Sequence, residues 1–234
     1  YNAAAEADAV RMLMARGIDG LMLVGAERAP ETAAMIAAAG LPLALTWRPA
    51  PGAAAVIVDN ERAGRLAAEH LVALGHRRIG MVIGRLAFND RQRGRLAGAR
   101  AYLESIGLGL PDWRVSEQPT TLAGGRGCAA LLELAEPPTA VIGGIDMIAI
   151  GCIVEAQARG MSVPGGLSVA GIDDLDMSAH LSPSLTTVHV PTARIGAEAA
   201  SMLLRAMRGE AAREVLELPV ELVVRRSSGP PATA

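Results

Sequence analysis

Lysine is absent from this chain of 234 residues, in which all 22 basic residues are arginine. The absence excludes lysine Schiff-base chemistry and any phosphate site centred on a lysine. Only two cysteines are present, Cys128 and Cys152, which are too few for a disulfide framework or a thiolate metal cage. A reducing, cytoplasmic location is the simplest interpretation of that low number.

Long apolar runs and an excess of positive charge are also missing. No apolar stretch reaches the roughly 18 residues of a membrane span, so no membrane partner is expected. The formal net charge of −2 excludes a strongly basic nucleic-acid-binding surface on this segment.

What is present is an alternation of short apolar runs with stretches of helical periodicity, which is typical of βα units around parallel sheets. Strands are predicted at 20–25, 41–46, 55–59, 78–84, 115–118, 140–144, 167–173 and 185–190, and helices at 3–16, 30–40, 61–74, 93–106, 122–134, 147–159 and 193–208. Two short extended pieces follow between 215 and 226, and the final residues, 227–234, are predicted to be disordered.

The sequence contains few residues in the patterns that catalysis or metal binding requires. The chain has no Gly-x-Ser-x-Gly motif, and its four histidines lack the spacing of metal ligands. The stretch Gly125-Arg-Gly-Cys-Ala-Ala130 matches a dinucleotide fingerprint formally, but the acidic residue expected about 20 positions later is missing. Close packing of a helix on a sheet explains these glycines equally well. We therefore expect no catalytic residue, no metal, no cofactor and no enzyme activity.

Charged residues follow two of the predicted strands. Asp173-Asp174-Leu-Asp176 comes directly after one strand, and Asp90-Arg-Gln-Arg-Gly-Arg95 comes after the strand that ends near Gly84. Ligands of open α/β sheets bind at the carboxyl ends of the strands. Asp173 and Arg95 would offer an acceptor and a fork of donors to a polyhydroxylated or carboxylated small molecule. An acidic cluster on a loop is also typical of solvated or helix-capping residues.

Four stretches form a more specific combination. They are Glu69-His-Leu-Val-Ala-Leu-Gly-His76 with Arg78-Ile79, Arg95-Leu-Ala-Gly98, Ser168-Val-Ala-Gly-Ile-Asp-Asp174 continuing to Ser182-Pro-Ser-Leu-Thr-Thr-Val188, and Leu218-Pro-Val-Glu-Leu-Val-Val-Arg225. Over nearly the whole chain they resemble the effector-binding core of the LacI/GalR family of bacterial transcription regulators.

The resemblance implies a periplasmic-binding-protein-like α/β fold of type I. Two lobes, each a parallel sheet flanked by helices, would hold the effector in the cleft between them. The N-terminal lobe would comprise 1–58 and 189–218, the C-terminal lobe 60–188 and 219–228, with 229–234 as a disordered tail. The N-terminal lobe would lack its first β-α-β segment, which leaves one position of its sheet unpaired.

The resemblance also implies a set of effector contacts. Arg95 and Asp173 would bind the effector from the C-terminal lobe, Thr120 would line the same mouth, and Phe88 and Asp90 would lie on the loop before the helix of Arg95. Substituting Arg95 or Asp173 by alanine is expected to abolish binding with little effect on the unliganded melting point.

Two positions depart from the family pattern and make the pocket less polar. Ile145 stands where members often have a polar residue, and Trp47 stands where many have an acidic one. An indole can stack on a sugar face or an aromatic ring, whereas a hexose held by many hydroxyl hydrogen bonds is less well matched. Ordinary packing explains both residues equally well.

The function implied by the resemblance is the sensing of a sugar or sugar-like metabolite that shifts the population of two conformations. The protein would be a homodimer and would reach operator DNA only through an N-terminal helix-turn-helix, which does not precede Tyr1 in this sequence. The alternative is a periplasmic solute-binding receptor of a sugar ABC transporter. That receptor shares the fold but would be monomeric and exported.

Overall fold

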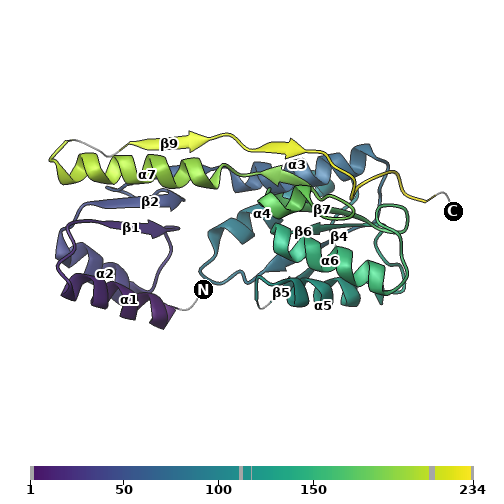
Figure 1. Ribbon diagram of the computed structural model, residues 1–234, viewed down its shortest axis with the longest axis horizontal. Coiled ribbons are helices and arrows are strands. Elements are labelled where there is room, and N and C mark those ends of the chain that lie inside the picture. Colours follow the sequence, from purple (N-terminus) through teal and green to yellow (C-terminus); the bar gives the residue numbers. More distant parts are fainter. Residues whose placement is uncertain (1–2, 111–112, 117, 211–213, 233–234) are drawn as a thin grey trace. The chain divides into compact units, whose positions relative to one another are not determined.

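The computed structural model describes residues 3–110, 113–116, 118–210 and 214–232. The chain forms two compact units (Figure 1). Unit 1 contains Tyr1–Val58, Ala87–Arg91 and Pro191–Pro219, and unit 2 contains Asp59–Leu86, Gln92–Val190 and Val220–Ala234. The segment 87–91 therefore groups with unit 1, although the sequence analysis had assigned it to the lobe spanning 60–188.

Unit 1 is built on a parallel sheet. Its strands β1 (Leu21–Val24), β2 (Leu43–Trp47), β3 (Ala54–Val58) and β9 (Val215–Leu218) follow the order β1-β2-β3-β9. Helices α1 (Ala3–Ala15) and α2 (Pro30–Ala39) cover one face of this sheet, and α7 (Thr192–Met207) covers the other (Figure 1).

The elements of unit 1 begin and end where local chemistry favours it. Pro30 opens α2, where its missing N–H costs nothing, and Gly40 ends the helix in the left-handed conformation. Val10, Leu21 and Ile36 form the core between these helices and the sheet. Among the described residues β1 lies at the sheet edge, and its Met22 and Val24 are about half exposed.

Unit 2 is built on a larger sheet with the order β10-β8-β7-β6-β4-β5. The strands are β4 (Ile79–Gly84), β5 (Trp113–Ser116), β6 (Ala140–Gly143), β7 (Ser168–Asp173), β8 (Thr186–His189) and β10 (Glu221–Val223). All described pairs are parallel except β10 with β8, which is antiparallel.

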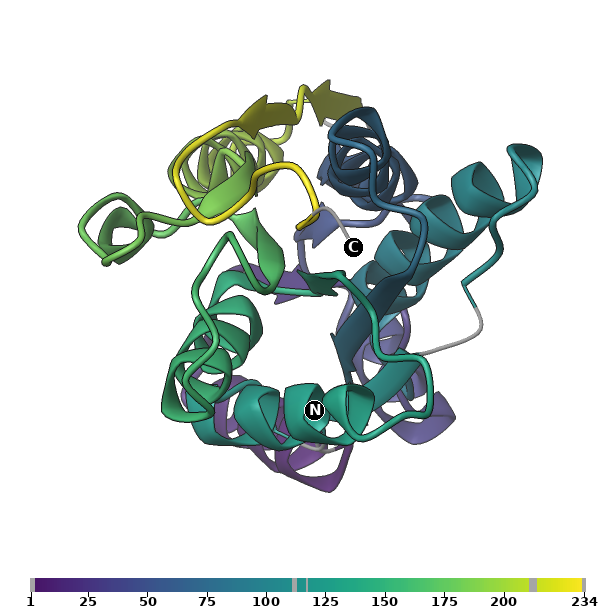
Figure 2. The same ribbon diagram turned by 90° about the vertical axis from the view of Figure 1, so that its right-hand side faces the viewer.

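Helices cover both faces of this sheet (Figure 2). They are α3 (Asn60–Ala73), α4 (Asp90–Ser105, whose first two residues belong to unit 1), α5 (Thr121–Leu132) and α6 (Asp146–Ala158), and a short 3-10 turn η1 spans Asp176–Ala179. The parallel sheets and flanking helices confirm the predicted α/β class.

The glycines of the apparent dinucleotide fingerprint serve packing. A Cβ on Gly127 would lie 2.5 Å from Val82 Cγ1, so α5 approaches the sheet too closely for any larger residue. Helices α5 and α6 also approach each other too closely for a side chain at Gly151 of α6, because a Cβ there would lie 2.1 Å from the Thr121 carbonyl oxygen of α5.

The C-terminal segment corrects one prediction. Ser227 is fully buried, its hydroxyl donates to the Val169 carbonyl at 2.7 Å, and it accepts from the Thr186 N–H at 2.8 Å. Further along, the Gly229 carbonyl accepts from His76 Nε2 at 2.9 Å. The prediction of disorder is therefore wrong for 227–229, and residues 233–234 lie outside the described part.

No helix in the described ranges is long and apolar enough to cross a membrane.

Candidate functional site

Arg95 on α4 gathers three polar groups at the carboxyl edge of the unit 2 sheet. Its Nε donates to Asn60 Oδ1 at 3.1 Å, Nη1 donates to the Gly144 carbonyl at 2.7 Å, and Nη2 forms an ion pair with Asp173 Oδ1 at 2.8 Å. Gly144 follows β6 and Asp173 ends β7, so one guanidinium ties neighbouring strand ends together. The structure thus pairs Arg95 directly with Asp173, whereas the sequence analysis expected both residues to face a ligand; their contact with a ligand stays a prediction.

Arg95 is also part of the core, because it is only 1% exposed. Removing it would leave the Asp173 carboxylate and the Gly144 carbonyl without this donor in a buried setting. The expectation that alanine at position 95 leaves the unliganded melting point unchanged is therefore inconsistent with the structure. Asp173 is the better position for a binding variant, since its side chain is 20% exposed.

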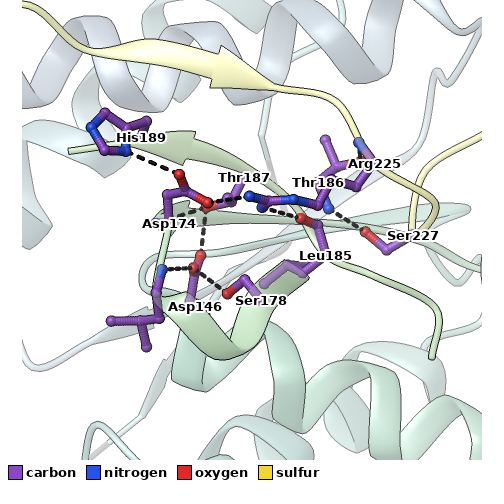
Figure 3. Close-up of polar contacts among 10 residues, drawn as sticks. Asp146, Asp174, Ser178, Leu185, Thr186, Thr187, His189, Arg225 and Ser227 are labelled. Carbon is purple, nitrogen blue, oxygen red and sulfur yellow. Dashed lines mark hydrogen bonds and ion pairs between the residues drawn. The ribbon is translucent and has the colours of Figure 1, made fainter. Parts of the chain in front are cut away.

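The backbone turns sharply at the end of β7. Asp173 and Asp174 have φ angles of 132° and 58°, a conformation that residues other than glycine adopt at a cost. Asp174 is held in place by an ion pair with Arg225 Nη2 at 2.6 Å and by a contact with His189 Nδ1 at 3.0 Å (Figure 3). These contacts stabilise the unusual backbone that presents Asp173 at the sheet edge.

Asp146 fixes the loop that follows. Its fully buried carboxylate accepts hydrogen bonds from the Leu175 N–H at 2.9 Å, the Ser178 hydroxyl at 2.6 Å and the Thr187 hydroxyl at 2.5 Å (Figure 3). This residue anchors η1 to the start of α6. The sequence analysis did not predict this anchoring role for Asp146.

Unit 1 holds the other predicted contacts, Trp47, Phe88 and Asp90. Trp47 ends β2 with φ 76°, and the Arg91 guanidinium lies 5.5 Å from the centroid of its ring. Phe88 has φ 53° and is 47% exposed, whereas Asp90 is 6% exposed. The contact of Arg91 with Trp47 and the position of Gly25 against Asp90 give the physical reason why 87–91 packs with unit 1.

The remaining two predicted contacts have local structural roles. Thr120 is the N-cap of α5, where its hydroxyl accepts from the Ala123 N–H at 3.2 Å. Ile145 precedes α6 and packs against the unit 2 core. Their contact with a ligand stays a prediction.

Sequence reasoning missed two residues that position this edge, Asn60 and Gln92. The buried Gln92 side chain accepts from the Gly84 N–H at 2.8 Å and donates to the Gly144 carbonyl at 3.1 Å, linking β4 to β6. Both residues lie in the first turn of a helix that follows a strand, and this position could have indicated in the sequence that they lie at the sheet edge. In the described part of the chain, no group of three or more His, Cys, Asp or Glu side chains could hold a metal ion.

Comparisons with known proteins agree with this architecture. Residues 68–228 match a family described as periplasmic binding protein-like domain. The chain is thus a domain of the periplasmic-binding-protein-like class.

A relative, the HTH-type transcriptional repressor PurR of Aliivibrio salmonicida, is 31% identical over 93% of this chain and 67% of its own length. The transcription regulator GntR from Chromobacterium violaceum superposes with a TM-score of 0.90 at 30% identity, covering 97% of this chain and 85% of that one. A LacI family regulator from Enterococcus faecium with bound ribose gives 0.86 at 26% identity, with coverages of 96% and 85%. This chain belongs to the LacI family of transcriptional regulators, which favours a regulator over a transporter receptor.

Proposed function

We propose that this chain senses a sugar or sugar-like metabolite at the carboxyl edge of the unit 2 sheet, with Asp173 as the acceptor for the ligand. The observation that carries the proposal is the fixed presentation of Asp173. Its backbone is held in a left-handed conformation, and Arg95 holds one carboxylate oxygen at 2.8 Å. A carboxylate oriented in this way binds a hydroxyl donor without the entropy cost of first ordering the side chain.

The same contacts suggest how occupancy would be transmitted. Asp173 is followed by Asp174, which pairs with His189 on β8. Val190 is the last residue of that segment of unit 2, and Pro191 begins a segment of unit 1. A ligand that displaces Asp173 would therefore bias the conformation of the segment that connects the units. Such a bias is a population shift, with a coupling free energy of about 1 to 3 kcal/mol.

The response would be regulatory and not chemical. The relative named as a repressor and the regulators of known structure support a protein that binds its ligand without converting it. We further propose that the protein acts as a homodimer in the cytoplasm and responds to the effector by changing its affinity for operator DNA through a helix-turn-helix segment.

A thermal-shift screen of sugars, sugar phosphates, polyols, nucleosides and aromatic acids tests this proposal. A ligand at about 100 times its Kd should stabilise the folded protein by about 2.7 kcal/mol. Asp173→Asn should weaken that ligand by at least about tenfold, because the amide replaces a charged acceptor. Asp176→Asn, an exposed residue of the following loop, is the matched control and should bind as the wild type does. Equal affinities of the two variants would contradict the proposed role of Asp173.

A further inference from the structure

An open pocket in unit 2 lies apart from the candidate site. Its volume is about 760 Å³, and it is lined by the end of α6, residues of the segments 162–164 and 179–184, and Arg226. The two segments lead into β7 and β8, so the pocket lies toward the amino ends of these strands, whereas Asp173 lies at the carboxyl end of β7. The six residues of β7 span about 17 Å. The pocket is therefore a separate surface of the same unit.

The polar side chains that line this pocket offer hydrogen-bond donors. Arg226 is exposed, and its guanidinium has no ion-pair or hydrogen-bond partner among the residues that the structure describes. The hydroxyls of Ser162, Ser182 and Ser184 also have no partner elsewhere in the described chain. The described lining includes no Asp or Glu side chain. A guanidinium and several hydroxyls without a nearby carboxylate favour an anionic ligand.

Hydrogen bonds between segments hold the sides of the pocket in place. Gln157 Nε2, near the end of α6, donates to the Ser182 carbonyl at 3.1 Å. The Arg226 N–H donates to the Ser184 carbonyl at 3.0 Å. These bonds join α6 and the C-terminal segment to the loop before β8. The backbone atoms that carry the donors of the pocket are thus fixed by contacts that involve no ligand.

The loop between β7 and β8, which lines part of the pocket, is also anchored to the core of unit 2. The Ser178 hydroxyl donates to the buried Asp146 carboxylate at 2.6 Å (Figure 3), and the Leu185 N–H donates to the Ser178 carbonyl at 2.8 Å. Val163 and Leu181 pack against the hydrophobic core and supply an apolar part of the lining. A pocket that is ordered in this way loses less conformational entropy when a ligand binds.

We propose that this pocket binds a small organic acid. The carboxylate or phosphate group of the acid pairs with the Arg226 guanidinium and accepts hydrogen bonds from the serine hydroxyls, while an apolar body lies against Val163 and Leu181. The volume leaves room for that body beside the anionic group, since small-molecule sites typically measure about 300–1,000 Å³. The site is distinct from the effector site at Asp173 and does not depend on the proposed function.

Matched pairs of small compounds test the charge requirement on the wild-type protein by calorimetry. The pairs are benzoate with benzyl alcohol and phenyl phosphate with phenol, which present the same ring with and without an anionic group. We expect at least one acid to bind at millimolar concentration, at least about tenfold more tightly than its neutral partner. The pair that shows the difference identifies the preferred anionic group. Equal affinities within both pairs, or no binding by either acid, would overturn the proposal.

Arg226→Gln tests the residue, because it removes the charge and keeps a polar side chain. The acid that binds the wild type should lose at least about tenfold in affinity. Arg208→Gln, at an exposed arginine that follows α7 in unit 1, makes the same change in net charge and should bind as the wild type does. Unchanged affinity of Arg226→Gln, or an equal loss in both variants, would show that Arg226 does not bind the acid.

Amide chemical-shift mapping of the wild type with the bound acid locates the site. The largest changes should fall on Ser162, Val163, Ser182 and Ser184. Changes concentrated at Asp173 would assign the acid to the effector site, so this inference would fail while the proposed function stands. If the acid maps to the pocket and the screen of sugars and related metabolites finds no ligand, the proposed function fails while this inference stands.

Discussion

At the scale of single residues, Arg95 is both a core residue and a member of the candidate site. Few arginines are fully buried, because a guanidinium must find hydrogen-bond acceptors for its donors away from water. Arg95 finds a carboxylate, a side-chain amide oxygen and a backbone carbonyl. This arrangement orders the Asp173 side chain before a ligand binds. The same contacts stabilise unit 2, so a change at Arg95 affects both ligand binding and stability.

Replacing Arg95 by methionine should therefore destabilise the unliganded protein. We expect the free energy of unfolding to fall by about 3 kcal/mol, because the mostly buried ion pair with Asp173 is broken and the Gly144 carbonyl loses a donor. Urea denaturation followed by circular dichroism measures this change.

Arg65→Met provides the comparison for that experiment. Arg65 forms an ion pair with Glu69 on α3, but its side chain is 60% exposed. Exposed pairs of this kind contribute little to stability, because water screens the two charges, so Arg65→Met should change the free energy of unfolding far less than Arg95→Met. Similar small losses for both variants would contradict a structural role for Arg95.

At the scale of elements, the sequence predicted most of the strands and helices because apolar periodicity and glycine stops are local signals. The order of the strand ends also led to the prediction that Arg95 and Asp173 share one cleft; in the structure they form an ion pair, and their contact with a ligand stays a prediction. Two features of the fold could not be predicted from local sequence patterns, because they depend on contacts between distant residues. The segment 87–91 packs with unit 1 through Arg91 and Trp47, which are far apart in sequence.

The C-terminal segment is the second such feature. Its serines, glycine and prolines are typical of a mobile tail, but the partners that order it lie on distant strands. Ser227 bonds to Val169 on β7 and Thr186 on β8, and Gly229 bonds to His76. These long-range hydrogen bonds have no signature in the composition of the segment.

The C-terminal segment should thus contribute measurably to stability. Ser227→Ala would leave the buried Val169 carbonyl and the Thr186 N–H without their partner, at a cost of about 1 to 3 kcal/mol. Ser105→Ala, an exposed serine at the end of α4, should cost less than about 0.5 kcal/mol. Chemical denaturation compares the two, and a neutral Ser227→Ala would mean that the segment is not docked in solution.

At the scale of the whole molecule, two histidines couple the stability of the fold to pH. Burial lowers the pKa of His76, which is 1% exposed, and the Gly229 carbonyl opposes this only in part. Burial, followed by repulsion from His76, lowers the pKa of His70. Both rings are therefore more readily protonated in the unfolded chain, where the pKa is about 6.5.

The contribution of these histidines should be complete above about pH 6.5 and be lost as the pH falls toward their folded pKa values. Urea denaturation at pH 7.5, 6.5 and 5.5 should show a declining free energy of unfolding. His76→Gln should reduce the decline, and His180→Gln, at an exposed position, should not. A wild-type protein that gains stability on acidification over this range would contradict the prediction.

The central claim is that the protein binds its ligand without converting it. The most direct test titrates the ligand found in the screen into the wild-type protein and into Asp173→Asn, and then analyses the ligand chemically. We expect the wild type to bind one molecule per chain, to release it unchanged after prolonged incubation, and to bind at least about tenfold more tightly than the variant. Consumption of the ligand, or equal binding by the two proteins, would contradict this account.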